Sequence, residues 1–161
     1  MRSNKIISIN DLSKKIADLK RKDKKIIHCH GVFDILHVGH IRHFNTAKNL
    51  GDVLIVTVTP DKYVKRGPGR PVFTEKQRAE AIAALEVVDY VVINKWPTAI
   101  KTIELIKPDF YVKGPDYKNH KNDITGNIKL EEDAVKRYGG IIQYTNGITF
   151  SSTRLINKNI T

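Results

Sequence analysis

The chain has 161 residues, 40% of them hydrophobic and 28% charged, a composition that excludes a disordered protein and suits one globular domain. Its formal net charge of +11 predicts an anionic partner, and because the basic residues are not interleaved with aromatic ones, we expect small phosphorylated anions and no nucleic acid. The single cysteine, Cys29, excludes an internal disulfide and a zinc site built from several cysteines.

Residues 1–24 predict a helical extension, with a helix near 10–22 that opens at Asn10 in NDLSKKIADLK. The start of the chain lacks the apolar core of a signal peptide, and no apolar run in the sequence approaches the roughly 20 residues of a membrane helix. We therefore expect a cytoplasmic protein that does not bind membranes.

Residues 25–161 predict a single domain in which buried strands alternate with helices. Apolar runs rich in β-branched residues indicate strands at 25–31, 53–59, 90–93, 110–113 and 140–145. Helical patterns occupy about 38–50, 74–86, 97–106, 129–138 and 151–158, with a capping box in TEKQ from Thr74 to Gln77 and a stop at Gly51. This alternation predicts an α/β fold, a Rossmann-like doubly wound parallel sheet of five strands with helices on both faces. Ligands of such sheets bind beyond the carboxyl ends of the strands.

The turn after the first strand contains HGVFDILHVGHIRH, residues 30–43, which holds four of the six histidines in the chain. His37 and His40 are three residues apart at the start of a helix, so their side chains project from one face. Free backbone N–H groups and the helix dipole favour an anion there, and Gly39 lacks a Cβ that would obstruct a phosphate. The pattern predicts a site for a phosphoryl group whose negative charge grows during reaction.

Other readings of these histidines are surface or core residues and a zinc site. A zinc site would add His28, His30 or Cys29, yet residues 28 and 30 share one strand face while 29 points to the other, and no carboxylate cluster completes a tetrahedral set. We expect His30 to lie at the end of a strand beneath the phosphate site and His43 to lie outside it.

The segment GVFDILHVGH resembles the G-x-F-D-x-x-H-x-G-H signature of the nucleotidyltransferase superfamily that includes glycerol-3-phosphate and ethanolamine-phosphate cytidylyltransferases and heptose-1-phosphate adenylyltransferase. The resemblance continues through LGDVLIVTVTPDKYVKRGPGRPV, QRAEAIAALEVVDYVV, IKPDFYVKGPDY and FSSTRLI, so it covers nearly the whole chain from about residue 25. KRGPGRPV, ALEVVD and VKGPDY are most similar to the heptose-1-phosphate adenylyltransferase type.

This resemblance implies transfer of a nucleoside monophosphate from a nucleoside triphosphate, ATP rather than CTP, to a phosphorylated sugar such as heptose 1-phosphate. The acceptor attacks in line and releases pyrophosphate without a covalent enzyme intermediate. The alternative is a CTP-dependent enzyme of the glycerol-3-phosphate type, but Asn146 stands where that type has an arginine. Mg²⁺ is expected with the triphosphate, held by phosphate oxygens and water and not by a carboxylate cage, and a homodimer is expected from the family.

The resemblance also assigns roles to individual residues. The implied catalytic residues are His37, His40, Lys65 and Arg154. The implied nucleotide-binding residues are Val32, Phe33, Gly39, Asp89, Ser151, Ser152 and Thr153. The implied substrate-binding residues are Arg78, Lys113, Asp116 and Tyr117. The simpler alternatives are an N-cap for the three hydroxyls and a surface ion pair for Arg78.

Two further classes fit part of the pattern. Class I aminoacyl-tRNA synthetases share the histidine signature, but this sequence lacks a K-M-S-K-S loop and an anticodon domain, so we reject that class. A basic binding module that keeps the fold without activity is the remaining alternative, and the intact His37, His40, Lys65 and SSTR segment argue against it. The heptose family also includes bifunctional proteins that carry a sugar kinase.

Overall fold

The computed structural model describes residues 4–123 and 126–147, and the structural statements below concern those residues. Its strands are β1 (Ile26–Gly31), β2 (Val53–Val58), β3 (Tyr90–Ile93), β4 (Phe110–Lys113) and β5 (Ile141–Tyr144). Its α-helices are α1 (Ile9–Arg21), α2 (Val38–Lys48), α3 (Glu75–Ala83), α4 (Ile100–Ile106) and α5 (Asn127–Arg137). Short 3-10 turns occupy η1 (Asp61–Tyr63), η2 (Pro115–Tyr117) and η3 (His120–Asn122). The helix expected at 151–158 lies outside the described residues.

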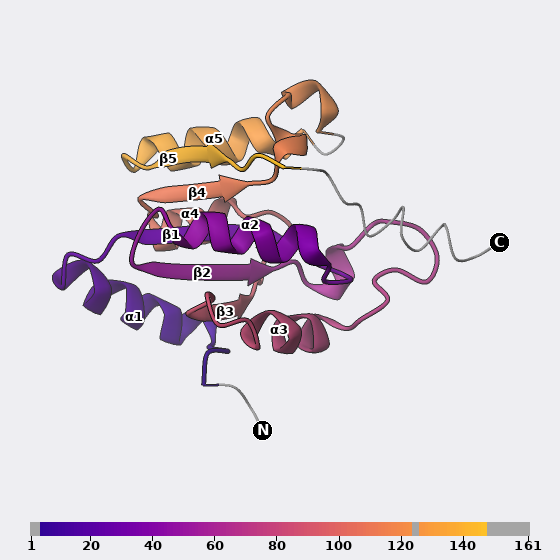
Figure 1. Cartoon of the computed structure of the whole chain (residues 1–161), viewed down its shortest axis with the longest axis horizontal. Coiled ribbons are helices and arrows are strands. Elements are labelled where there is room, and N and C mark those ends of the chain that lie inside the picture. The colour runs from indigo at the N-terminus through magenta and orange to yellow at the C-terminus, as the bar shows by residue number, and fades with distance from the viewer. Residues whose placement is uncertain (1–3, 124–125, 148–161) are drawn as a thin grey trace.

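All five strands pair in parallel, in the order β3-β2-β1-β4-β5 (Figure 1). The five strands therefore form the predicted Rossmann-like doubly wound sheet. The chain winds outward from β1 in both directions, through β2 and β3 on one side and through β4 and β5 on the other. The gap beyond the carboxyl ends of β1 and β4 is thus the switch point where such sheets bind ligands.

Helices cover both faces of the sheet, as Figure 1 shows. On one face α2 and α3 pack against the strands through a cluster that includes Phe44, Ala47, Ala79, Ile82, Cys29 and Val56. On the other face α1 and α4 contribute to a cluster that includes Leu12, Ile16, Ile106, Ile26 and Ile55, and α5 packs beside β4 through Ala134, Val135 and Tyr111. The alternating strand residues supply both clusters, because successive side chains in a strand point to opposite faces.

The segment expected as an N-terminal extension is built into this core. Helix α1 buries Leu12 and Ile16 against the sheet. The backbone just before it pairs with β3, since the Ile7 N–H donates to the Val91 carbonyl at 3.0 Å and the Val91 N–H donates to the Lys5 carbonyl at 2.9 Å. These bonds occupy the outer edge of β3, which would otherwise offer unpaired groups to another chain.

One helix signal in the sequence is a cap as predicted, one is displaced, and Gly51 lies beyond Asn49, the C-cap of α2. Thr74 and Gln77 form the predicted capping box at the start of α3. Helix α1 begins slightly earlier than predicted, because its N-cap is Ser8 and not Asn10. The Ser8 hydroxyl accepts from the Asp11 N–H at 3.1 Å. Gly51 follows α2 where a Cβ would come within 2.6 Å of the Ile27 side chain, so the tight approach to β1 requires glycine. None of the helices in the described ranges has the length and hydropathy needed to cross a bilayer.

Candidate active site

A pocket lies at the switch point of the sheet, beyond the carboxyl ends of β1, β4 and β5. The turn after β1 and the start of α2 contribute one wall, formed by His30, Gly31, Val32, Phe33, Asp34, His37, Gly39, His40, Arg42 and His43. The loops after β4 and β5 contribute the other wall, formed by Val112, Lys113, Gly114, Pro115, Asp116, Tyr117, Thr145, Asn146 and Gly147, and Arg66 reaches it from a separate loop. The structure therefore brings together eight predicted site residues: Val32, Phe33, His37, Gly39, His40, Lys113, Asp116 and Tyr117.

The two histidines of the HVGH motif stack on each other at the start of α2. His37 is the N-cap of the helix, and its Nδ1 accepts from the Gly39 N–H at 3.1 Å. His40 lies against it, with ring centroids 3.9 Å apart and 25° between the planes. Because Nδ1 of His37 is an acceptor, its neutral ring carries the proton on Nε2. The helix start thus offers two imidazole groups, but the N–H groups of Gly39 and His40, which were expected to be free for an anion, already donate to Nδ1 and to the carbonyl of His37.

The turn that presents these histidines is shaped by Phe33. This residue has a positive φ of 50°, a conformation that non-glycine residues seldom adopt outside special turns. Its ring packs edge-on against His40, with centroids 5.4 Å apart and planes at 85°. A Cβ on Gly31 would come within 2.9 Å of the same ring, so Gly31 leaves the space in which Phe33 supports His40.

The histidines of the pocket are neutral at pH 7. Burial lowers the pKa of His40 to about 4, assisted by the charges of His37, His43 and Arg66, and burial also lowers the pKa of His37. Burial lowers the pKa of His43 to about 4, with Lys113 adding to the effect. An incoming polyphosphate would act in the opposite direction, because negative charge favours the protonated imidazole.

His43 belongs to the pocket, so the prediction that it lies outside the site is wrong. One helical turn separates it from His40, and that spacing places both on the same side of α2. Its Nδ1 lies 3.0 Å from the Thr145 hydroxyl, which is 3.4 Å from the Lys113 carbonyl. This links α2 to the ends of β4 and β5 across the floor of the pocket. His30 lies at the end of β1, as predicted, and lines the pocket.

The opposite wall contains a buried cation. Lys113 ends β4, its side chain is 8% exposed, and its Nζ lies 3.7 Å from Oε2 of Glu131 and 4.2 Å from the ring centre of Tyr117. Burial by itself would lower the pKa of Lys113, but Glu131 and Tyr117 outweigh burial and raise it. The pocket therefore keeps a protonated lysine, paired with Glu131, beside Asp116 and Tyr117.

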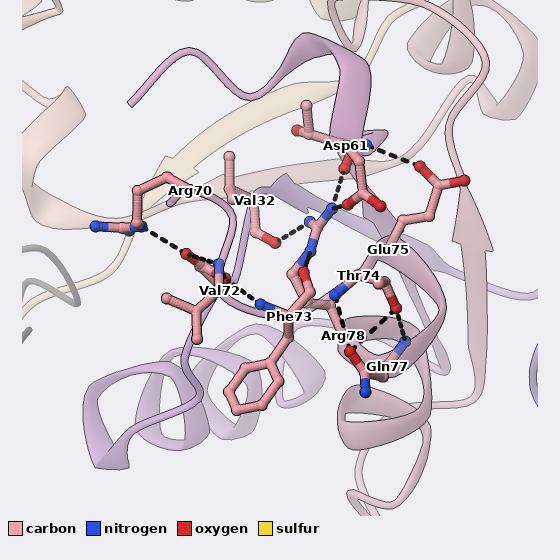
Figure 2. A network of polar contacts seen from close by, with 11 residues as sticks. Val32, Asp61, Arg70, Val72, Phe73, Thr74, Glu75, Gln77 and Arg78 are labelled. Carbon is pink, nitrogen blue, oxygen red and sulfur yellow. Dashed lines mark hydrogen bonds and ion pairs between the residues drawn. The ribbon is translucent and has the colours of Figure 1, made fainter. Parts of the chain in front are cut away.

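A strap, residues 66–73, contributes Arg66 to the pocket and is fastened by Asp34 of the signature motif. The Asp34 carboxylate accepts hydrogen bonds from the N–H groups of Val72 and Phe73 and from Nε of Arg70, which lies 2.7 Å away. These three donors are labelled in Figure 2. Burial would raise the pKa of Asp34, yet these donors hold it below its usual value. Both partners of the ion pair are buried, with side-chain exposures of 7% for Arg70 and 1% for Asp34. Sequence reasoning did not single out Asp34, although it stands in the motif, because its partner is 36 residues away.

The structure gives Arg78 a structural position, which corrects its prediction as a substrate-binding residue. Its side chain is 0% exposed, and the guanidinium donates to the carbonyls of Val32, Thr59 and Phe73 and to the carboxylate of Asp61, as Figure 2 shows. A group buried in this way holds the loops after β1 and β2 against α3. The ion-pair alternative was closer, although the arginine of the pair is fully buried while the Asp61 side chain is 37% exposed.

Asp89 also lies away from the pocket, at the opposite edge of the sheet. Its carboxylate accepts from the Leu54 N–H at 2.7 Å and pairs with Lys48, so it ties the end of α2 to the starts of β2 and β3. The prediction that it binds nucleotide is therefore wrong. Lys65 is exposed and does not line the pocket, whereas its neighbour Arg66 does. Ser151, Ser152, Thr153 and Arg154 lie outside the described residues.

The carboxylates of the pocket do not form a metal cage. Within residues 4–123 and 126–147, no group of three or more histidine, cysteine, aspartate or glutamate side chains is placed to hold a metal ion. Asp34 is occupied by the strap, and Asp116 is the other carboxylate that lines the described part of the pocket. This donor set fits a Mg²⁺ ion that coordinates mainly phosphate oxygens and water.

A helix N-terminus with imidazoles, placed at the switch point of a parallel sheet, defines a nucleotide-binding protein of the α/β class. Residues 28–158 match the model of the cytidylyltransferase-like family, and the chain belongs to this family. The resemblance noted in the sequence is thereby confirmed at the level of the family.

The curated relatives are longer proteins. The chain is 52% identical over 142 residues to "Bifunctional protein HldE" of Campylobacter jejuni (strain RM1221). The matched region spans 87% of this chain and 29% of the relative. It is 38% identical over 160 residues to the protein of the same name from Geobacter metallireducens, spanning 96% of this chain and 31% of the relative. The chain thus spans less than a third of the length of these relatives.

Two solved structures are similar to this fold. A lipopolysaccharide core biosynthesis protein from Thermoplasma volcanium superposes with a TM-score of 0.59 at 31% identity, covering 75% of this chain and 93% of that one. A pantoate-β-alanine ligase from Francisella tularensis, solved with a β,γ-ATP ligand and β-alanine, superposes with a TM-score of 0.61 at 18% identity over 97% of this chain and 73% of that one. The second similarity concerns the fold alone.

Proposed function

We propose that this chain is a nucleotidyltransferase that transfers the adenylyl group of ATP to a sugar 1-phosphate, with heptose 1-phosphate as the acceptor. The observation that carries the proposal is the pairing of two walls in one pocket. One wall is the stacked His37–His40 pair at the N-terminus of α2, and the other is the buried Lys113 with Asp116 and Tyr117. The relatives named HldE and the VKGPDY segment support the heptose acceptor.

In this proposal the triphosphate lies over the first strand-helix turn. Backbone groups of Val32 and Phe33 face it, and Gly39, which lacks a Cβ, lets its phosphates approach the positive end of the α2 dipole. His37 donates through Nε2, and His40 lies beside it, so both stabilise charge that grows on the phosphate oxygens. Ser151, Ser152, Thr153 and Arg154 would hold the outgoing pyrophosphate, as the family resemblance implies.

The acceptor phosphate is held from the other wall. Lys113 supplies the positive charge, and Asp116 and Tyr117 contact the sugar. An oxygen of the acceptor phosphate attacks the α-phosphorus, the bond from that phosphorus to the bridging oxygen breaks, and pyrophosphate leaves with the bridging oxygen. Alignment of the two substrates between the walls supplies most of the rate enhancement.

The proposal also includes a metal ion, a location and an oligomeric state. Mg²⁺ bound to the triphosphate would neutralise part of its charge, and it would be held by phosphate oxygens and water, with Asp116 the available carboxylate of the described pocket lining. We place the protein in the cytoplasm and expect a homodimer, as the family resemblance implies.

The test is a pyrophosphate-release screen that crosses ATP, CTP, GTP and UTP with heptose 1-phosphate, other sugar phosphates and glycerol 3-phosphate. The expected result is release with ATP and heptose 1-phosphate. Turnover with CTP and glycerol 3-phosphate in preference to that pair would contradict the substrate assignment. Salt-sensitive RNA binding with no pyrophosphate release from any pair would instead favour a basic binding module.

A further inference from the structure

A chain of hydrogen-bonding side chains runs from the interior of the sheet to the floor of the pocket. It crosses between β1 and β2, which lie side by side in Figure 1. His28 Nε2 lies 2.8 Å from the Thr57 hydroxyl, and His30 Nδ1 lies 2.8 Å from the same hydroxyl. His30 Nε2 lies 3.3 Å from the Thr59 hydroxyl. Of the two histidines, His28 is completely buried and His30 lines the pocket.

The number of protons limits the directions in which the hydrogen bonds between His28, Thr57 and His30 can run. Burial lowers the pKa of His28 to about 3 and lowers the pKa of His30 well below its usual value, so each neutral ring carries one proton. The Thr57 hydroxyl has one proton and can donate to only one of the two rings. It must therefore accept from the other. The chain then has two possible directions, either from His28 toward His30 or from His30 toward His28.

An unsatisfied atom decides between the directions. Nδ1 of His28 is buried and has no hydrogen-bond partner among the described residues. If the chain ran from His30 toward His28, this nitrogen would carry the proton and be a buried N–H without an acceptor, which is rare in folded proteins. If the chain runs from His28 toward His30, the same nitrogen carries only a lone pair, and every proton of the chain is directed at an acceptor.

We propose that the chain runs from His28 through Thr57 to His30, so that His30 presents a fixed Nε2–H donor to an oxygen atom of the bound substrate. His28 and Thr57 are then positioning residues, since they act on substrate only through His30. The 3.3 Å contact of His30 with Thr59 is longer than an ordinary hydrogen bond, so a ligand oxygen can replace the Thr59 hydroxyl as the acceptor at small cost. The oxygen belongs to a phosphate or hydroxyl group, and this role rests on the proposed nucleotidyl transfer.

The direction of the chain can be measured on the free protein by ¹⁵N NMR of the imidazole rings, which distinguishes the two tautomers. His28 and His30 are expected to carry the proton on Nε2. His43 provides an internal comparison with the opposite tautomer, because the Thr145 hydroxyl can donate to the Lys113 carbonyl and then accept from Nδ1–H of His43. A proton on Nδ1 of His30 would overturn the proposal, and this reading does not depend on whether the enzyme activity is assigned correctly.

The role in substrate binding is tested with two variants at one position. Thr57→Val keeps the shape of the buried side chain but removes the hydroxyl, and Thr57→Ser keeps the hydroxyl. We expect Thr57→Val to lower kcat/KM roughly 10-fold, and Thr57→Ser to stay within about 3-fold of the native protein. A rise in KM for ATP alone assigns the oxygen to the triphosphate, and a rise for the sugar phosphate alone assigns it to the acceptor.

Two results would overturn this role. One is unchanged kinetics in Thr57→Val, because the hydroxyl would then be irrelevant to binding. The other is an equal loss in both variants, because packing and not the hydroxyl would then be responsible. If Thr57→Val does not fold, the tautomer of His30 in the native protein still decides the direction of the chain.

Discussion

The imidazole rings of His37 and His40 lie stacked at the start of α2, with their centroids 3.9 Å apart. Two imidazolium ions at this distance would repel each other, and burial already disfavours the charge on each ring. The free site therefore holds neutral rings beside the N–H groups of the helix. A triphosphate supplies the negative charge that this arrangement lacks, so the stacked pair is prepared for an anion without carrying the cost of two buried positive charges.

The first prediction concerns His40. We expect His40→Ala to lower kcat/KM by on the order of 100-fold or more, because one group that stabilises the transition state is removed. Pyrophosphate release measures the effect, and denaturant unfolding checks that the fold is kept. His120→Ala is the matched control, since His120 pairs with Glu132 and does not line the pocket. Near-normal turnover in His40→Ala would contradict the assignment.

The second prediction separates two neighbouring cations in the loop after β2. Arg66 lines the pocket, whereas Lys65 is exposed beside it. We expect Arg66→Ala to raise the KM for ATP by roughly 10-fold, since a charge-assisted contact to phosphate is lost. Steady-state kinetics of Arg66→Ala and Lys65→Ala provide the comparison. A normal KM in Arg66→Ala together with an inactive Lys65→Ala would show that the lysine implied by the family performs this role.

The third prediction concerns the fastening of the strap by Asp34. Asp34→Ala removes the carboxylate from a buried arginine and two backbone N–H groups, so we expect a loss of roughly 3–5 kcal/mol in the free energy of unfolding. The KM for ATP should also rise, because Arg66 is carried by the same strap. Asp52→Ala is the control, since Asp52 accepts from the Lys25 N–H at the far edge of the sheet. A stability loss in Asp34→Ala no larger than in the control would contradict this role.

The fourth prediction is a fall in stability at acid pH. The pKa of His28 is about 3, and the pKa values of His40 and His43 are about 4 in the folded protein, all below the value near 6.5 of an unfolded histidine. Unfolding therefore takes up protons as the pH falls below about 6.5, and each such histidine should remove about 1.4 kcal/mol of unfolding free energy per pH unit down to its folded pKa. Denaturant titrations at pH 7.5, 6.0 and 5.0 measure the slope.

The same titrations on a variant that lacks one shifted histidine provide the control. His43→Asn removes one of the shifted histidines, so the dependence on pH should become shallower by about the contribution of one proton. An unfolding free energy that stays constant between pH 7.5 and 5.0 would show that these rings are not held neutral in the folded protein.

The positions of the strands are the part of the fold that follows most directly from the sequence. Nearly continuous apolar runs mark strands buried on both faces, and each of the five predicted strands lies within one residue of its observed bounds. The start of α1 was less accurate, because Ser8 and Asn10 are both good caps and the choice depends on which residue reaches a free N–H. The packing of α1 into the core was not predicted, since its docking depends on contacts with distant residues such as Ile55 and Ile106.

In the site, residues close to one another in sequence were predicted better than those that depend on long-range contacts. His37, Gly39 and His40 act within one helical turn, so their spacing is sufficient to place them. Arg78 and Asp89 were misplaced because their partners come from other loops and strands, which spacing does not reveal. For His43, the period of α2 was a usable signal, since it lies one turn after His40 on the same side.

The most direct test of the central claim is the stoichiometry of products from ATP and heptose 1-phosphate. If the acceptor phosphate attacks the α-phosphorus in the pocket between His37, His40 and Lys113, pyrophosphate and the nucleotide-linked sugar will form in equal amounts, and His40→Ala will lose both. Release of ADP or inorganic phosphate in place of pyrophosphate, or no turnover of any nucleotide with any phosphorylated sugar, would contradict it.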